Sequence, residues 1–456
     1  MPRSQPSRKS INTKMQPGEK STQRDRLVAG IVRVTNRDGY ARASVAAVVA
    51  EAKVSKPTFY VYFRNLDDCF VGAWVGVHER LLEQVRAAIT EQPAADATVI
   101  AMVTIVAFAG SEPGLARFLM NEPLAAGTPA LDARDRGIAD IASVIEEALE
   151  SASPDASTPD VPLPRVIGGL YRLLASRLRR GEPATNELLE DIGDWIKRYE
   201  APRREHRWSA LKASPPLEPS PFLPKAQLRA PIALPPGRPR LSEAEVAVNQ
   251  RRRIMFSAAR LAEEKGYAAT AVTEIAKRAR VDLRTFYSLF AEKQEAFMAA
   301  HQLGFQEVMA VAALAFFAGA TWPERSWEAG RAFTQFLELN PTIASIGFVE
   351  AYAAGPGAAQ RIEDSHFAFK IFLQEGVHSV KSDPPSPIAL EAIVATIFEI
   401  VYGEVRVGRS AEISRTLPQI AYLWLTPFLG PGAANRFIDD RGTVDVRATK
   451  VVKKRT

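Results

Sequence analysis

Residues 270–290, with the sequence TAVTEIAKRARVDLRTFYSLF, decide how this chain is organised, because a related stretch occurs a second time. Residues 43–63 have the sequence ASVAAVVAEAKVSKPTFYVYF, and a shift of 227 positions aligns the two copies without a gap. Each copy is typical of two short helices joined by a tight turn, with a small polar residue, Ser55 or Asp282, opening the second helix. The pattern predicts a helix-turn-helix in each copy.

The repeat extends well beyond these two stretches. A proline, a glutamate and a glycine recur with the same spacing at an offset of 228, as Pro113, Glu122 and Gly127 and again as Pro341, Glu350 and Gly355. The offset then returns to 227 for Gly181 with Gly408 and for Trp195 with Tyr422. A repeat this long is not a solenoid unit of a few tens of residues. The duplication indicates two whole subunits fused into one chain.

Composition narrows the class of protein. The chain has 456 residues, 46% of them hydrophobic and 24% charged, as in an ordinary globular protein. Its single cysteine, Cys69, excludes an internal disulfide and a multi-thiolate metal site, and its five histidines lack metal-ligand spacing. The longest apolar runs, 97–110 and 308–320, are shorter than the roughly 20 residues that span a membrane. We therefore expect a cytoplasmic protein without metal, cofactor, membrane contact or enzymatic activity.

A formal net charge of +6 permits a polyanionic partner without requiring one. Residues 1–22 are basic and lack apolar periodicity, which predicts a disordered arm that either solubilises the protein or contacts DNA. The domain boundaries that we expect are a basic arm at 1–22, helix-turn-helix domain 1 at 23–66, helical domain 1 at 67–200, a proline-rich linker at 201–244, helix-turn-helix domain 2 at 245–292, helical domain 2 at 293–436 and a basic tail at 437–456.

At the repeated motif, Gly-Tyr-x-x-(Ala/Thr)-(Ser/Ala)-Val followed by Val-(Ser/Asp)-x-x-Thr-Phe-Tyr-x-x-Phe, the chain resembles the TetR/AcrR family of bacterial regulators. The motif spans 39–63 and 266–290. The resemblance implies an all-α fold with two TetR-like subunits in one chain. Each subunit would have three helices for DNA, further helices around a ligand cavity, and two final helices for dimerisation. Members of the family usually repress transcription and release DNA when a small molecule binds.

The chain departs from the family pattern at several positions. Lys53 and Arg280 stand in the turn where the family often has glycine, so we expect this turn to avoid positive φ. Lys293 matches a family lysine that contacts phosphate at the start of the fourth helix. Its counterpart is Leu66, next to Asp67 and Asp68. The hold of the first unit on DNA then depends on Arg64.

Residues near the start of each second helix are expected to read bases, and their neighbours to contact phosphates. We assign Lys56 and Pro57 to the groove in the first unit, and Leu283 and Arg284 in the second. The remaining DNA-binding candidates are Ser44, Thr58, Tyr60, Arg64, Thr270, Thr285, Tyr287 and Lys293. Tyr60 and Tyr287 also fit a packing role. Because the two groove sets differ, the chain is expected to read two unlike half-sites.

Residues 166–199 and 393–425 are expected to be two helical hairpins, and the resemblance to the family implies that they pack as a four-helix bundle within one chain, an intramolecular pseudo-dimer. Several apolar side chains either line a cavity for an apolar effector or simply pack the helical core; they are Met102, Phe108, Phe118, Phe333, Phe336, Phe348 and Tyr352. The leading interpretation is a repressor that binds double-stranded DNA and responds to a small molecule. The alternative is a helical small-molecule-binding protein with degenerate DNA-binding units.

Overall fold

The computed structural model describes residues 22–152, 157–159, 162–182, 184–202, 217–234, 241–380 and 383–452. Apart from Thr22, the expected basic arm lies outside these residues. Helices account for almost all of the regular structure, which confirms the all-α prediction. Within the described ranges the strands are β1 (Ser157–Pro159) and β2 (Glu200–Pro202), which form one short antiparallel pair.

The first half of the chain begins with a helix-turn-helix domain and continues into a helical domain. Its helices are α1 (Gln23–Asp38), η1 (Tyr40–Arg42), α2 (Val45–Ala52), α3 (Lys56–Tyr62), α4 (Leu66–Thr90), η2 (Ala94–Asp96), α5 (Ala97–Ser111), α6 (Pro113–Met120), α7 (Glu122–Ala125), α8 (Thr128–Ser151), α9 (Leu163–Arg180) and α10 (Asn186–Lys197).

The second half repeats this order with local differences. Its helices are α12 (Glu243–Lys265), α13 (Val272–Ala279), α14 (Leu283–Leu289), α15 (Lys293–Phe316), α16 (Trp322–Leu339), α17 (Pro341–Phe348), η4 (Glu350–Ala354), α18 (Pro356–Phe367), η5 (Ala368–Lys370), α19 (Ile371–Ser379), α20 (Pro387–Arg406), η6 (Ser410–Thr416), α21 (Leu417–Leu429) and α22 (Pro431–Val452). The last helix, α22, crosses position 437, where we expected a tail to begin.

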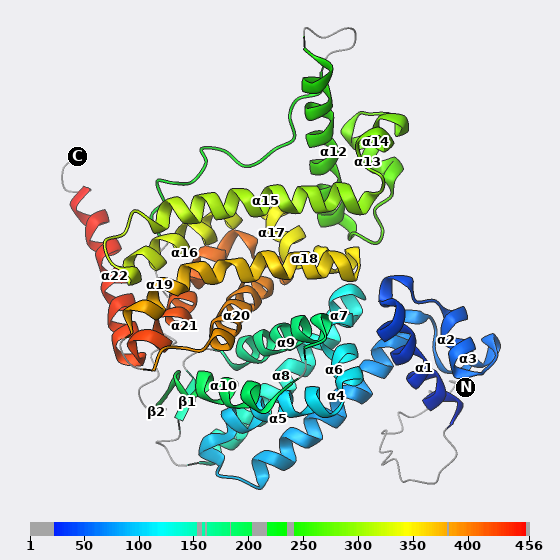
Figure 1. Cartoon of the computed structure of the whole chain (residues 1–456), viewed down its shortest axis with the longest axis horizontal. Coiled ribbons are helices and arrows are strands. Elements are labelled where there is room, and N and C mark those ends of the chain that lie inside the picture. The colour runs from blue at the N-terminus through cyan, green and yellow to red at the C-terminus, as the bar shows by residue number, and fades with distance from the viewer. Residues whose placement is uncertain are drawn as a thin grey trace, which may run out of the picture.

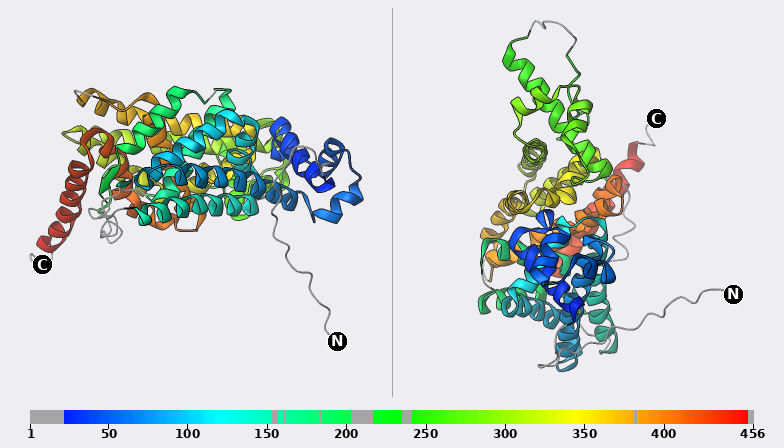
Figure 2. Two further views of the ribbon diagram at one scale, coloured as in Figure 1. Left: turned by 90° about the horizontal axis from the view of Figure 1, so that it is seen from below. Right: turned by 90° about the vertical axis from the view of Figure 1, so that its right-hand side faces the viewer.

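The two helix-turn-helix domains lie at the same end of the helical core. In Figure 1, α2 and α3 lie at the right edge, and α13 and α14 rise above the upper right of the core, while α22 lies at the opposite end. The right-hand view of Figure 2 looks at this side and shows both domains, one above the other. Both domains therefore lie at the end of the core away from α22, and they point in different directions.

The two halves meet through α9 and α20, which cross in antiparallel directions at the centre of the core. Arg165 near the start of α9 packs against Gly403 near the end of α20. Midway along the two helices, Gly169 lies against Thr396. Gly169 and Thr396 differ by 227 positions, so they are equivalent residues of the two halves. Equivalent residues therefore meet at the centre of the interface. The halves are arranged as a pseudo-dimer.

The linker is bound to the second half over part of its length. The backbone N–H of Ser220 donates to Gln335 and that of Leu228 to Asn340, each at 2.8 Å, so the linker follows α16. Further along, the carbonyl of Ile232 accepts a hydrogen bond from Asn249 on α12 at 3.2 Å.

Within the described residues one stretch, Ala94–Ser111, is long and apolar enough to cross a membrane by length and composition alone. Half of this window is buried within the protein. It contains α5, which packs against α4, α8 and α10.

Candidate nucleic-acid interface and its coupling to the core

The outward face of α3 follows from its cap and its buried aromatic residues. The hydroxyl of Ser55 accepts a hydrogen bond from the N–H of Thr58 at 3.2 Å, which starts the helix. Phe59 and Phe63 are buried and fix the helix against the rest of the domain. Lys56 and Pro57 are exposed, and Tyr60 is 52% exposed, as expected for residues that face DNA.

The second helix-turn-helix has the same construction with different exposed residues. Asp282 caps α14 by accepting from the N–H of Thr285 at 2.6 Å, and this hydrogen bond lowers the pKa of Asp282. Phe286 and Phe290 are buried in the same way as Phe59 and Phe63. Leu283, Arg284 and Tyr287 are exposed, the tyrosine at 56%. The two recognition helices therefore share a scaffold and present unlike side chains.

Both turns adopt the left-handed conformation, so our expectation that they avoid positive φ is wrong. Lys53 has φ 53° and ψ 48°, and Arg280 has φ 51° and ψ 49°. Both side chains point to solvent, so the conformation creates no buried clash. In the second turn, the guanidinium of Arg253 donates to the carbonyls of Ala279 and Arg280, which helps to hold it.

Arg64 does not stand free to contact phosphate. Its guanidinium pairs with Asp68 at 3.0 Å, and this hydrogen bond lowers the pKa of the Asp68 carboxyl group. The neighbouring Asp67 accepts a hydrogen bond from the hydroxyl of Tyr40. Both aspartates at the start of α4 thus have partners within the protein, and the charge of Arg64 is offset by one of them.

Lys293 occupies a structural position at the base of the second domain. Its ammonium donates to the carbonyls of Tyr267 and Thr270 at 3.0 Å and of Ala268 at 3.3 Å, and lies 4.4 Å from the centre of the Tyr267 ring. Burial lowers the pKa of this lysine, with a smaller contribution from Lys265. The three N–H groups of the Lys293 ammonium thus hold the loop between α12 and α13. The equivalent residue of the first half, Leu66, cannot form these bonds.

The two remaining candidates differ in accessibility. Ser44 is exposed and caps α2 by accepting from the N–H of Ala47 at 3.2 Å. Thr270 is only 4% exposed, and its hydroxyl donates to the carbonyl of Gly266 at 2.9 Å. By position, the counterpart of Ser44 is Ala271 rather than Thr270.

A pair of glutamates that we noted only as repeat markers connects each DNA-binding domain to the core. Glu122 accepts from the backbone N–H of Tyr40 at 2.8 Å, and Glu350 accepts from that of Tyr267 at 2.7 Å. Burial raises the pKa of Glu122 to about 7 and also raises that of Glu350. Their recurrence at matched positions was the signal in the sequence. What it could not show was that each carboxyl group reaches a backbone N–H some 80 residues away.

The candidate ligand residues are distributed over separate parts of the core. Met102, Phe108 and Phe118 are buried in the first half, and Phe336 is buried in the second. Phe333 and Phe398 line two cavities of about 50 Å³ and 30 Å³, and Phe348 lines the smaller of them. Tyr352 lies elsewhere, with its hydroxyl bonded to Arg172 of the first half. These cavities are much smaller than the roughly 300–1,000 Å³ of a typical ligand pocket.

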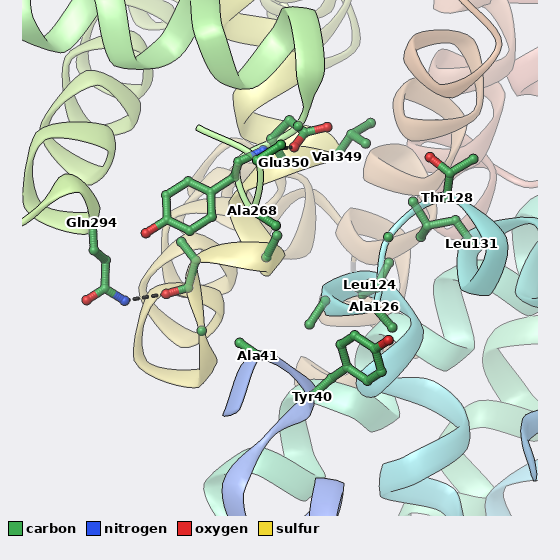
Figure 3. A pocket seen from close by; sticks show the side chains of 18 of the residues that line it. Tyr40, Ala41, Leu124, Ala126, Thr128, Leu131, Ala268, Gln294, Val349 and Glu350 are labelled. Atoms are coloured by element: carbon green, nitrogen blue, oxygen red, sulfur yellow. Dashed lines mark hydrogen bonds between the residues drawn. The ribbon is translucent and has the colours of Figure 1, made fainter. Parts of the chain in front are cut away.

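A larger cleft of about 1230 Å³ separates the DNA-binding domains from the core at the junction of the two halves. Figure 3 shows Tyr40, Leu124 and Thr128 of the first half facing Ala268, Gln294 and Glu350 of the second around this space. The cleft is lined by Tyr40 and Tyr267, whose backbone N–H groups donate to Glu122 and Glu350. Any molecule in this cleft would lie beside both connections to the DNA-binding domains.

A model of the bacterial regulatory proteins of the tetR family matches the chain twice, at residues 27–73 and 254–300. The two matches cover both helix-turn-helix domains and the start of the long helices α4 and α15. No curated protein matches the chain.

Several solved structures are similar to parts of this chain. A TetR family transcription regulator from Marinobacter aquaeolei VT8 has 18% sequence identity and a TM-score of 0.34, and the match covers 40% of this chain and 96% of that one. A TetR-family transcriptional regulator from Streptomyces coelicolor has 19% identity and a TM-score of 0.30, over 39% and 97% of the two chains. The transcriptional regulator FadR from Bacillus subtilis, solved in complex with stearoyl-CoA, has 13% identity and a TM-score of 0.33, over 38% and 96%.

Proposed function

We propose that this chain, in which two helix-turn-helix domains match the tetR-family model, controls transcription by binding duplex DNA with both domains at once. The observation that supports this best is the position of the two domains, which lie at the same end of a shared core (Figure 1). A dimeric helix-turn-helix protein needs this arrangement to place two recognition helices in successive major grooves. The protein works as a single cytoplasmic chain in this proposal, since each half supplies the partner of the other.

The operator in this proposal has two unlike half-sites about one helical turn apart. A symmetric dimer reads a palindrome because its recognition helices are identical. Here the exposed groove residues are Lys56 and Pro57 in one domain and Leu283 and Arg284 in the other. Arg284 can bond a guanine with two hydrogen bonds, a contact that discriminates between bases by about 1–3 kcal/mol.

Selection of bound sequences from a random DNA pool tests this reading. We expect two half-sites with different consensus bases, at a fixed spacing. Recovery of a perfect palindrome as the preferred site would contradict the proposal. Footprinting on the DNA next to the gene, with and without a panel of small molecules, then identifies the target and any effector.

For the effector, we propose an apolar molecule that enters the second half beside Phe333 and Phe348 and releases the protein from DNA, as a repressor would be released. The cavities there are narrow, so binding requires movement of the surrounding aromatic side chains. Movement of η4 would reach the DNA-binding domain directly, because Glu350 at its start is bonded to Tyr267. A thermal-shift screen in which Phe348→Ala changes the response would support this location.

One observation favours a second candidate function, a small-molecule-binding protein whose first DNA-binding domain no longer binds. The start of α4 carries Asp67 and Asp68, and the nearby Arg64 is paired with Asp68. Binding to the upstream DNA that weakens steeply with salt would favour the regulator, because phosphate contacts release counterions. Binding of a ligand without any salt-dependent DNA binding would favour the alternative.

A further inference from the structure

The centre of the interface between the halves holds a buried group of charges that the proposed DNA-binding function does not use. Glu399 on α20 accepts from Arg172 on α9 at 3.2 Å and from Arg134 on α8 at 2.9 Å. The three residues are only 2%, 2% and 1% exposed. Burial opposes ionisation of Glu399, but the two arginines hold its pKa below the ordinary value. The group is therefore a charged network enclosed by both halves.

The position of this network relative to the repeat is its informative feature. Arg172 and Glu399 are 227 positions apart, so they are the same position in the two halves. In a symmetric dimer this position would face its own copy across the axis. Here an arginine faces a glutamate. Arg134 corresponds to Ile362 of the second half, at an offset of 228 positions. It therefore has no charged counterpart.

A second pair of equivalent residues at the interface differs in size instead of charge. Gly169 lies against Thr396, again 227 positions away. A Cβ on Gly169 would overlap the threonine and come within 2.7 Å of its Cα. The small residue of one half therefore accommodates the larger residue of the other.

One set of ion pairs away from the axis follows the opposite pattern and serves as an internal comparison. Arg179 pairs with Glu363 of the second half, and Arg406 contacts Asp135 of the first half at 4.0 Å. Arg179 and Arg406 are equivalent, as are Asp135 and Glu363, so each half carries one arginine and one acid at these places. These pairs would form equally well between two identical halves. These pairs therefore favour neither kind of partner, unlike the axial residues.

From these contacts we infer that the surface formed by α8 and α9 of the first half accepts the second half and rejects another copy of itself. Two first halves in the same geometry would bring together two copies of Arg172 and two of Arg134, without Glu399. Two second halves would bring together two copies of Glu399 without those arginines, and two copies of Thr396 without the glycine. Buried charge without a partner is strongly destabilising, and such repulsion is a common source of binding specificity. The inference does not depend on DNA binding.

The pairing can be tested with a protease site inserted between residues 203 and 216 of the full chain. After cleavage, the two fragments are unfolded together in urea, refolded at micromolar concentration, and weighed as intact complexes by native mass spectrometry. We expect every complex to contain one N-terminal and one C-terminal fragment. Homotypic complexes in the proportion that random association gives would overturn the inference.

Substitution of the axial charges should relax this preference. In the variant Arg134→Met, Arg172→Met and Glu399→Leu, apolar side chains of similar size replace the network, an exchange that proteins can tolerate. Complexes of two N-terminal fragments should then appear, because the buried charges on the axis no longer oppose them. The matched control is Arg179→Met with Glu363→Met, which removes an off-axis pair. This control should leave the pairing exclusively heterotypic, and homotypic complexes in it would also count against the inference.

A double-mutant cycle on the uncut chain decides the matter if the cleaved protein does not refold. Glu399→Gln leaves two buried arginines without their carboxylate and should lower the Tm by roughly 4 °C. Adding Arg172→Gln to this variant should lower the Tm by much less than it does in the wild-type chain. Additive losses would show that the two side chains do not act as a pair, and would overturn the inference.

Discussion

At the residue scale, the repeat predicted which side chains face outward but not what they bind. The spacing of Phe59 and Phe63 explains why both lie in the core, because residues four apart share one face of a helix. The partners of Arg64 and Lys293 depend on side-chain rotamers and on loops, which no local pattern encodes. Lys293→Ala, expected from the sequence to remove a phosphate contact, should therefore act by loosening the loop between α12 and α13.

The left-handed turn of the second domain leads to a stability prediction. Arg280→Gly should stabilise the domain by about 0.5–1 kcal/mol, because glycine adopts positive φ without the steric cost of a Cβ. Hydrogen exchange of the amides in α13 and α14 measures the free energy of local opening. The control is Lys277→Gly in the right-handed part of α13, which should destabilise by about 1 kcal/mol. Equal losses in both variants would contradict the prediction.

The exposed groove residues lead to a prediction about specificity. Arg284→Ala should relax base preference in one half-site by about 1–3 kcal/mol, and Lys56→Ala should do so in the other half-site only. Competition binding with operators altered one base pair at a time measures both effects. A uniform loss on all sequences from Arg284→Ala would assign that side chain to phosphate instead.

At the element scale, helix limits were predictable wherever a local cap sets them. Ser55 and Asp282 open the recognition helices, as their positions in the sequence indicated, and Gly39 and Gly266 end the first helix of each half. The contacts between elements were not predictable in this way. Glu122 lies 82 residues from Tyr40, and a single sequence contains no signal for such a distant hydrogen bond.

The connection between Glu122 and the first domain should make stability depend on pH. Its folded-state pKa of about 7 lies above the ordinary value of 4.5, so the folded protein binds a proton more tightly than the unfolded chain does. This contribution is fully present below pH 4.5 and is lost as the pH rises through 7. Glu122→Gln keeps an acceptor for the Tyr40 N–H and removes the charge. We expect it to be near neutral at pH 5 and to stabilise by about 1–2 kcal/mol at pH 8.

Thermal unfolding of both chains at the two pH values measures this difference. Glu122→Ala serves as the control, since it removes the acceptor and should destabilise at both pH values. A glutamine variant that loses the same stability at pH 5 and pH 8 would show that ionisation of Glu122 has no part in the connection.

At the scale of the whole molecule, the duplication predicted the architecture better than any single motif. Two subunits joined by a linker bury their dimerisation surfaces most readily against each other, because the linker makes this pairing intramolecular. The sequence could not show that the axial position pairs Arg172 with Glu399, because the charges lie in separate helices that meet only in the folded core.

The proposed pseudo-dimer predicts the state of the protein in solution. Sedimentation at micromolar concentration should show a single species of one chain, with a mass of 49.9 kDa, because the surface that would bind a second subunit is already occupied. Disappearance of this species in favour of two-chain particles alone would contradict the prediction.

Residues 217–234 of the linker are hydrogen-bonded to the second half, so the two DNA-binding domains differ in what restrains them. The backbone of this segment is fastened to Gln335 and Asn340 on α16, and its far end is fastened to Asn249 on α12. Rotation of the second DNA-binding domain must either move this segment or break its hydrogen bonds. Among the described residues, no comparable segment precedes α1. The two domains should thus differ in how easily they reorient. An effector that acts on α16 would pull on only one of them.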